Sequence, residues 1–415
     1  MDATFMTALH IAHVRHLKDI HIPLSAEKTT ALILTGKNGS GKTSVLESLE
    51  RFLGYVVSPN FYTKEQCQTY IENDKKQISL LSETDDGRIE SESFKNALAN
   101  WEKYLSYWTD GIIVDFTSYA DLRTKYKAGN YILAYYKDKR EVRVETSKNI
   151  EKIELKPVYS LSDHPSHQLV KYLVNLKTTE AFARTNNNPK RAEEIADWFT
   201  RFEKILRSIY EDDSLTLNFD IETFQFTIST KGREAFDFNA MSMGYAAVFD
   251  IISDLIMRME SQRRYDLEGI VLIDEIETHL HVELQKKIVP ILMALFPNLQ
   301  FVLTTHSPFI LNSTPNAVVY DLENKTLVEN GLTNLPYDGI VEGYFGVDLL
   351  SQELREKFEA YKSLATKVDL KDEDFAKAAE LELYLDEVPD YLAVDFSAEY
   401  SRLKLELSKR GERID

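Results

Sequence analysis

The chain has few of the residues that define several classes of protein. Among its 415 residues there is one cysteine, Cys67, which excludes an internal disulfide framework and a cysteine-rich zinc or iron–sulfur site. No apolar run approaches the roughly 20 residues that span a bilayer. The N-terminal residues also lack the basic and apolar regions of a signal peptide. We therefore expect a soluble, cytoplasmic protein with no membrane partner.

Positive charge is also scarce. The chain has 67 acidic and 49 basic residues, which give a net charge of −18 at pH 7. This balance disfavours a protein that wraps nucleic acid over a broad basic face, although a local basic groove stays open as an alternative. Hydrophobic residues make up 43% of the chain and aromatic residues 11%, so it can bury a sizeable core in two or three structural units.

The most specific motif is glycine-rich. Residues 36–43 read GKNGSGKT and match G-x-x-x-x-G-K-[ST], between a buried strand at 31–34 and a predicted helix. In this motif the backbone N–H groups and the helix N-terminus surround phosphates. We expect Lys42 to reach the β- and γ-phosphates and the Thr43 hydroxyl to ligate Mg²⁺. The predicted phosphate-binding residues are Gly36, Asn38, Gly39, Ser40, Gly41, Lys42, Thr43 and Ser44.

Adjacent carboxylates follow the apolar strand predicted at 269–273. A buried strand should not end in Asp274 and Glu275 unless that end faces a charged ligand. Asp274 is the expected partner of the Mg²⁺ shell, and Glu275 is placed to polarise the water that attacks the γ-phosphate. The alternative interpretation is a strand that runs into an ordinary acidic loop. The glycine-rich phosphate-binding motif at 36–43 (the P-loop) makes this alternative the weaker one.

Two further clusters of polar residues could also contact a phosphate. The apolar strand at 301–303 runs into residues 304–307 (TTHS), and His306 there would contact the γ-phosphate or the attacking water. Upstream, Ser242 and Gly244 stand at the start of a predicted helix, where hydroxyl and N–H groups can bind an anion. Taken alone, the pattern at Ser242 and Gly244 fits a simple helix N-cap better than an anion-binding site.

The order of these four motifs resembles the ABC-type ATPases, within them the SMC and RecF-like branch. Residues 272–281 (LIDEIETHLH), 297–301 (PNLQF) and 304–308 (TTHSP) are similar to the OLD-like and anti-phage defence ATPases of the PtuA- or retron-associated type. The resemblance covers most of residues 7–321 and, less distinctively, the tail from Gly343. It implies an α/β fold: an ABC-type P-loop ATPase head, a mixed sheet flanked by helices, with a helical lobe or insertion and a helical C-terminal tail.

The resemblance also implies ATP and Mg²⁺ as cofactors and a sandwich of two heads around two nucleotides. Ser242 and Gly244 would then act on the partner's nucleotide, in a homodimer or a higher homo-oligomer. The sequence departs from the family at 241–245 (MSMGY), where the usual signature begins Leu-Ser and continues Gly-Gly-Gln. The family's glutamine-containing loop has no clear match, and the strand end at Asp115 is a candidate region without a glutamine. Arg15 resembles an arginine that such heads use near the phosphates.

We divide the chain into four predicted segments. Residues 1–155 are the N-terminal part of the head with the P-loop and a helical insert, and 156–212 are a helical lobe or insertion. Residues 213–345 are the C-terminal part of the head, and 346–415 are an acidic helical tail. The short separation of Lys42 and Asp274 leaves no room for a long SMC-type coiled coil.

The resulting hypothesis is a sensor or regulatory ATPase of a bacterial anti-phage defence system, which controls a separate nuclease or toxin. A DNA-repair head of the RecF type, a transporter ATPase and a self-sufficient nuclease are the alternatives. For a nuclease, 372–374 (DED) fits Asp-x-Asp, but no buried strand precedes it and a solvated acidic face is the better interpretation. His279 and His281 lie just past Glu275, where a dimer contact and a structural role are equally open.

Overall fold

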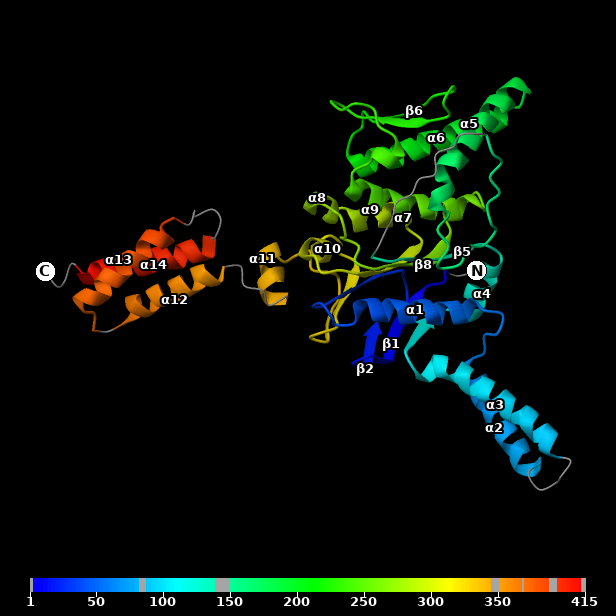
Figure 1. Ribbon diagram of the computed structural model, residues 1–415, viewed down its shortest axis with the longest axis horizontal. Coiled ribbons are helices and arrows are strands. Elements are labelled where there is room, and N and C mark those ends of the chain that lie inside the picture. Colours follow the sequence, from blue (N-terminus) through cyan, green and yellow to red (C-terminus); the bar gives the residue numbers. More distant parts are fainter. Residues whose placement is uncertain are drawn as a thin grey trace. The chain divides into compact units, whose positions relative to one another are not determined.

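The computed structural model describes residues 3–81, 87–138, 150–344, 351–367, 369–387 and 394–411. The chain separates into two compact units, Met1–Tyr337 and Asp338–Asp415. The predicted boundary after residue 345 lies outside the described residues, and the four-segment division stays a prediction. Figure 1 shows the elements of both units in sequence colours.

A mixed sheet forms the centre of the first unit. Within the described residues it has six strands in the order β11–β10–β3–β9–β8–β5, and β11 alone among these runs antiparallel to its neighbour. Nearly all residues of the parallel strands are buried, as a sheet covered on both faces requires. The strand bounds are Ala31–Thr35 (β3), Tyr131–Tyr136 (β5), Glu268–Ile273 (β8), Leu299–Thr304 (β9), Ala317–Asp321 (β10) and Thr326–Val328 (β11).

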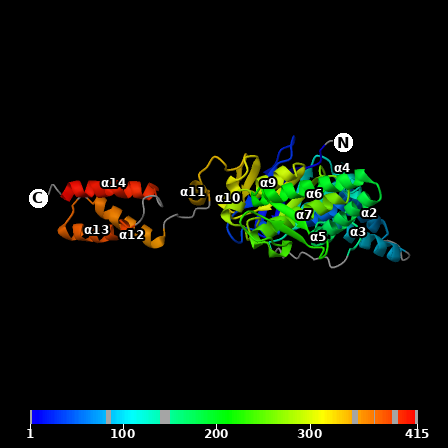
Figure 2. The same cartoon turned by 90° about the horizontal axis from the view of Figure 1, so that it is seen from above.

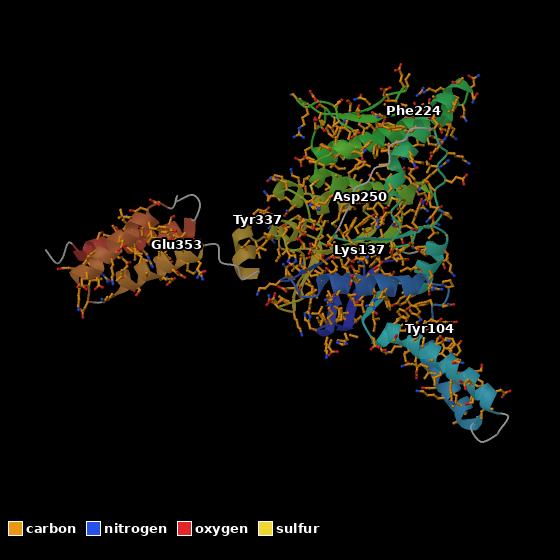
Figure 3. The ribbon with its side chains drawn as sticks, in the orientation of Figure 1. Tyr104, Lys137, Phe224, Asp250, Tyr337 and Glu353 are labelled. Carbon is orange, nitrogen blue, oxygen red and sulfur yellow. The ribbon has the colours of Figure 1, made fainter. Side chains whose placement is uncertain are left out.

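Helices cover both faces of this sheet. Helix α1 (Lys42–Val57) lies on one face, and α7 (Met243–Glu260) and α9 (Ile288–Leu295) lie on the other (Figure 1). Figure 3 shows side chains filling the layers between them. This arrangement confirms the predicted α/β class with a mixed sheet between helices. Shorter helices are α8 (Val282–Gln285), α10 (Pro308–Asn312) and α11 (Tyr337–Gly339), with 3₁₀ turns at Pro165–Gln168 and Phe238–Ala240 and a π-helical turn at Ile340–Tyr344.

An antiparallel sheet of β2 (Leu17–Pro23), β1 (Met6–Val14) and β4 (Ile112–Phe116) packs against α1. Helix α4 (Tyr119–Lys127) follows β4. Helices α2 (Lys64–Leu81) and α3 (Gly87–Thr109) form a hairpin that leaves the body of the unit below α1 in Figure 1. The hairpin lies within residues 1–155, for which a helical insert was predicted.

A second helical pair, α5 (Leu169–Thr185) and α6 (Pro189–Tyr210), lies above α7 in Figure 1. Its apolar side packs on α7 and α9. The strand pair β6 (Thr216–Phe219) and β7 (Phe226–Ser229) accompanies it. The helical lobe predicted between 160 and 210 is therefore present.

The second unit consists of α12 (Gln352–Thr366), α13 (Asp372–Leu385) and α14 (Val394–Gly411), seen from above in Figure 2. These helices share a core of their own, and the helical tail is confirmed. The buried residues of that core are Phe358, Tyr361, Ala365, Ala378, Leu385, Phe396, Tyr400, Leu403 and Leu407. Asp374 lies in the first turn of α13, where its Oδ2 accepts from the backbone N–H of Lys371 at 3.0 Å and from Lys367 Nζ at 2.7 Å.

Candidate functional site

The P-loop joins β3 to α1, and its backbone depends on glycine. Gly36, Gly39 and Gly41 have φ angles of 132°, 85° and 100°, a region that side-chain-bearing residues rarely adopt. A Cβ at Gly36 would lie 2.8 Å from Ser40 Oγ, so the loop also closes too tightly for a side chain. The middle of the loop, at Asn38 and Gly39, is exposed and can meet a ligand from solvent.

Lys42 begins α1 and turns back over the loop. Its Nζ donates to the carbonyl oxygens of Gly36 at 2.8 Å and Lys37 at 3.1 Å, and its side chain is buried. Burial lowers the Lys42 pKa, and nearby carboxylates, Glu275 foremost, oppose that shift. The lysine therefore lies in the field of the carboxylates predicted to share its site. Thr43 is exposed in the first turn of α1, whereas Ser44 is buried.

Asp274 and Glu275 follow β8, and β9 beside it holds both in place. Thr304 Oγ1, at the end of β9, donates to Asp274 Oδ1 at 2.5 Å and accepts from the backbone N–H of Glu275 at 2.7 Å. Asp274 is 1% exposed. Its backbone N–H donates to the Tyr136 carbonyl at 2.8 Å, which ties the same point to β5. One threonine hydroxyl thus sets the geometry of both acidic residues.

His306 lies beside Glu275, as the pairing of β8 with β9 predicts. Its Nε2 is 4.0 Å from Glu275 Oε1. Burial, and then the charge of Lys42, lowers the His306 pKa, and both effects favour the neutral imidazole. Glu275 has a φ of 43°, and a left-handed backbone at a non-glycine residue is a strain that functional sites often hold.

Two acidic residues of this neighbourhood were not predicted. Glu277 Oε1 accepts from the backbone N–H of His306 at 2.5 Å and so positions the histidine loop. Asp321 ends β10 and is buried, and a Cβ at Gly36 would lie 3.3 Å from its Oδ1. The sequence signal for Asp321 was the one used for Asp274: an apolar strand that ends in a carboxylate. Beyond it, Glu323 pairs with the Lys37 ammonium at 3.0 Å.

The turn between β1 and β2 also borders the P-loop. A Cβ at Gly41 would lie 3.0 Å from Leu17 Cδ1 and 3.7 Å from His16 Cε1. Arg15 belongs to this turn, with a φ of 55°. The structure therefore places the predicted arginine next to the phosphate loop in the fold.

The candidate region for the glutamine-containing loop lies in the antiparallel sheet and not in the central one. Asp115 belongs to β4 of the antiparallel sheet, where its Oδ2 is 2.7 Å from His10 Nε2. The strand beside β8 is β5, so the loop that adjoins the acidic cluster begins at Lys137, labelled in Figure 3. Residues 139–149 of that loop lie outside the described residues.

Ser242 and Gly244 form a separate surface at the start of α7. Ser242 is the exposed N-cap residue, and its hydroxyl makes no capping hydrogen bond. Gly244 packs on the segment after β8, since a Cβ there would lie 2.9 Å from the His279 carbonyl oxygen. His281 caps α8 and accepts from the Glu283 N–H at 3.5 Å. Gly244 thus contacts the His279 segment, and the described contacts of Ser242 and Gly244 do not include Lys42.

The donor set suits magnesium better than a transition metal. Among the described residues there is no group of three or more His, Cys, Asp or Glu side chains arranged around one metal ion. Thr43 and Asp274 offer oxygen ligands, and Mg²⁺ takes one or two protein ligands together with waters and phosphate oxygens. Both residues therefore carry the type of donor atom that Mg²⁺ prefers.

A family profile described as "AAA domain, putative AbiEii toxin, Type IV TA system" matches residues 32–312, and the chain belongs to this family. The Septu protein PtuA of Bacillus mycoides (strain KBAB4) is 25% identical over 97% of the chain and 55% of its own length. The Retron Vc95 "probable ATPase" of Vibrio cholerae is 24% identical over 70% of the chain and 68% of its own length. The chain thus spans about half the length of the Septu relative. The predicted resemblance to defence-associated ATPases is confirmed.

Solved structures similar to the chain include two SMC heads. A structure of the SmcHead bound to the C-winged helix domain of ScpA has 12% identity and a TM-score of 0.39, over 80% of this chain and 98% of that one. The SMC head domain from Thermotoga maritima has 12% identity and a TM-score of 0.36, over 79% and 96%. Across the described residues, no helix combines the length and apolarity needed to cross a membrane.

Proposed function

We propose that the chain binds MgATP, hydrolyses it slowly and uses the nucleotide as a switch for dimerisation. The observation that carries this proposal is the parallel order of β3, β9 and β8, which brings the P-loop after β3 and the carboxylates after β8 to the same edge of the sheet. Lys42 and the loop N–H groups bind the phosphates, and Thr43 and Asp274 hold Mg²⁺. Bound Mg²⁺ supplies charge neutralisation at the phosphates. Glu275 takes a proton from the attacking water.

His306 and Thr304 support this chemistry from β9. A neutral imidazole can donate a hydrogen bond to the γ-phosphate or accept one from the water, so His306 registers which nucleotide is bound. Glu277 keeps the histidine loop in place through the bond to its backbone N–H. Thr304 keeps Asp274 and Glu275 aligned.

The position of the signature residues Ser242 and Gly244 supports the proposed dimerisation. Ser242 and Gly244 lie on an exposed helix start whose described contacts do not include Lys42. An uncapped helix N-terminus with a free-standing serine hydroxyl is suited to the γ-phosphate of a second copy. We propose a homodimer, or a higher homo-oligomer, that closes on ATP.

The biological setting rests on the relatives named Septu and retron ATPases. We propose that this cytoplasmic ATPase senses infection in a bacterial anti-phage defence system and controls a separate nuclease or toxin. A RecF-type DNA-repair head is the alternative, and a salt-dependent DNA-binding titration separates the two. The net charge of −18 favours a protein partner over a broad nucleic-acid interface.

Lys42→Ala tests the nucleotide site. We expect loss of ATP binding, measured by titration of a fluorescent ATP analogue, and loss of phosphate release. Lys42→Arg keeps the charge and separates loss of function from misfolding, and Lys64→Ala at the exposed start of α2 is the matched control. Unchanged ATP binding in Lys42→Ala would remove the phosphate-loop assignment.

Glu275→Gln tests both hydrolysis and dimerisation. The amide cannot take a proton from water, so we expect ATP to stay bound and the dimer to persist, seen by light scattering after size-exclusion chromatography. Glu283→Gln, an exposed change in α8, is the control. If Glu275→Gln releases phosphate at the parental rate, Glu275 is not the base. If it holds ATP as a monomer, the dimer proposal fails.

A further inference from the structure

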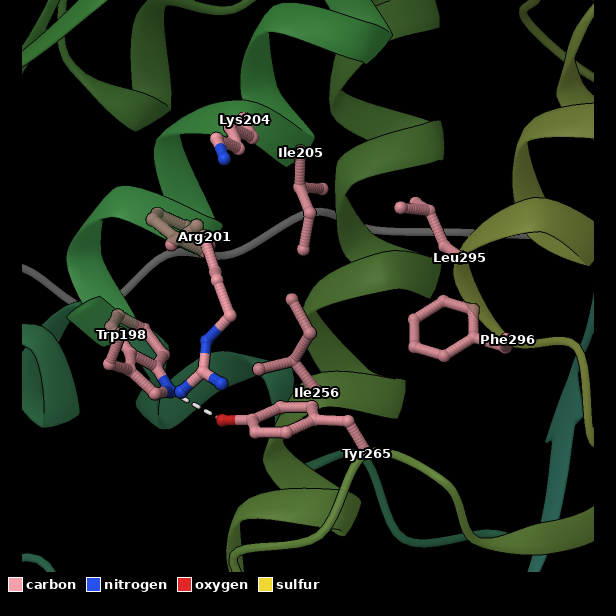
Figure 4. A pocket seen from close by; sticks show the side chains of 9 residues that line it. Trp198, Arg201, Lys204, Ile205, Ile256, Tyr265, Leu295 and Phe296 are labelled. Atoms are coloured by element: carbon pink, nitrogen blue, oxygen red, sulfur yellow. Dashed lines mark hydrogen bonds between the residues drawn. The ribbon is translucent and has the colours of Figure 1, made fainter. Parts of the chain in front are cut away.

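A cavity of about 260 Å³ lies away from the P-loop, between α6, α7 and the end of α9 (Figure 4). Trp198, Phe202 and Ile205 of α6 form one wall. Ile256 of α7 and the Leu295–Phe296 corner form the other, and Tyr265 closes the lower side. Most of this lining is apolar, so the cavity favours an apolar body.

Hydrogen bonds keep the aromatic walls in place. Trp198 Nε1 donates to Glu260 Oε1 and to the Tyr265 hydroxyl, both at 2.5 Å, and the indole stacks on Phe202 with ring centroids 5.2 Å apart. Glu260 is buried and also accepts from the Tyr172 hydroxyl. Because Trp198 is held at its polar edge and on its face, the cavity is already formed without a ligand.

Two cations stand at the mouth of this cavity. The Arg201 guanidinium carbon lies 5.4 Å from the centre of the Tyr265 ring, and Lys204 follows three residues later on the same helix. Both side chains belong to exposed residues. Arg201 also interacts with the buried Glu260 carboxyl, whose pKa is raised by burial. The two positive charges of Arg201 and Lys204 exceed that one acidic group and favour an anion at the opening.

We propose that this cavity binds a small organic anion with an aromatic body, with the ring between the α6 and α9 walls and the acid group at Arg201 and Lys204. The volume lies below the roughly 300–1,000 Å³ of sites for drug-sized ligands, which limits the ligand to one or two rings. Carboxylate and phosphate are the acid groups that a guanidinium recognises best.

The position of the cavity links such a ligand to the nucleotide site. Its walls belong to α7, whose N-cap residue is Ser242, and to the corner that leads into β9, which ends at Thr304. A ligand that contacts α6, α7 and this corner favours one arrangement of the three and so changes the affinity for ATP or its turnover. This coupling rests on the proposed function, whereas binding to the cavity does not.

The binding test uses three probes with the same ring and different charge: indole-3-acetate, 3-methylindole and tryptamine. Calorimetric titration without nucleotide should give one site per chain for indole-3-acetate and at least tenfold weaker binding of tryptamine. Ile205→Trp fills the cavity and should abolish binding. The absence of saturable binding up to millimolar concentration, or equal binding of the anion and the cation, would overturn the proposal.

The charge requirement has its own variants. Arg201→Gln with Lys204→Gln should weaken indole-3-acetate binding at least tenfold and leave 3-methylindole unchanged. Lys190→Gln, an exposed change at the start of α6, should alter neither. Binding that survives the double change contradicts the assigned acid-group position.

Lys42→Ala should still bind indole-3-acetate, which separates failure of this site from failure of the ATP site. Unchanged ATP turnover in the parent chain saturated with indole-3-acetate would refute the coupling.

Discussion

The buried pair Asp254–Arg258 should be the most sensitive ionic interaction of helix α7. Arg258 Nε donates to Asp254 Oδ2 at 2.6 Å, and the guanidinium also donates to the carbonyls of Leu133 at 3.0 Å and Ser160 at 2.9 Å. The Tyr136 hydroxyl donates to Asp254 Oδ2 at 2.7 Å. The side chain of Arg258 is 2% exposed and that of Asp254 is 0% exposed. The pair therefore fixes the signature helix to the end of β5, beside the acidic cluster.

Arg258→Leu should destabilise the protein by about 3–5 kcal/mol, because Asp254 is left as a buried and uncompensated charge. The carbonyls of Leu133 and Ser160 lose their donors as well. A second change, Asp254→Leu, removes that charge and should recover roughly 1–3 kcal/mol of the loss. Loss of the Tyr136 hydrogen bond makes this recovery incomplete.

Urea unfolding of the parent and the variants, followed by circular dichroism, measures these differences. The control is Arg264→Leu, because Arg264 and Asp266 form an ion pair of the same type at the surface, with side chains 51% and 66% exposed. We expect that change to cost about 0–1 kcal/mol. Equal losses in Arg258→Leu and Arg264→Leu, or a double variant no more stable than Arg258→Leu, would refute the reasoning.

Three further predictions concern the nucleotide site. Thr304→Val removes the donor to Asp274 and the acceptor for Glu275, and should cost roughly 1–3 kcal/mol in urea unfolding and slow phosphate release. Gly41→Ala forces a side chain into a left-handed backbone against Leu17, and should cost about 1–2 kcal/mol and weaken ATP binding. The lowered His306 pKa means that, as the pH falls through about 6.5, the unfolded chain takes up this proton first and stability decreases. Denaturation midpoints at pH 7.5 and 5.5 should therefore differ less in His306→Asn. Parental stability in Thr304→Val, parental ATP affinity in Gly41→Ala, or an unchanged pH effect in His306→Asn would contradict each prediction in turn.

Local patterns were enough to predict the parts of the site that depend on one stretch of chain. The P-loop needs glycine at positions with positive φ, and its strand and helix follow from the apolar pattern on either side. Asp274 and His306 were found because each follows an apolar strand in polar surroundings. The fold class came from the family resemblance that the order of the four motifs carries.

Contacts between neighbouring strands required the tertiary structure. Strand order decides that β5, and not β4, adjoins β8, so the chain that leaves β5 at Lys137 follows the strand next to the acidic residues. The same order brings Thr304 to Asp274 and places Asp321 near the phosphate loop. The sequence of a strand that ends in threonine or aspartate does not show which position that strand takes in the sheet.

The sequence by itself determined the glycine-dependent backbone of the P-loop and the acidic end of β8, on which the proposed nucleotide site rests, because these features depend on side-chain chemistry and local backbone geometry. The tertiary structure alone decided which partners hold them and where the aromatic cavity forms. Both depend on the packing of segments that are distant in the sequence, and no local pattern specifies that packing. The contact of Trp198 with Glu260 and Tyr265 is an example.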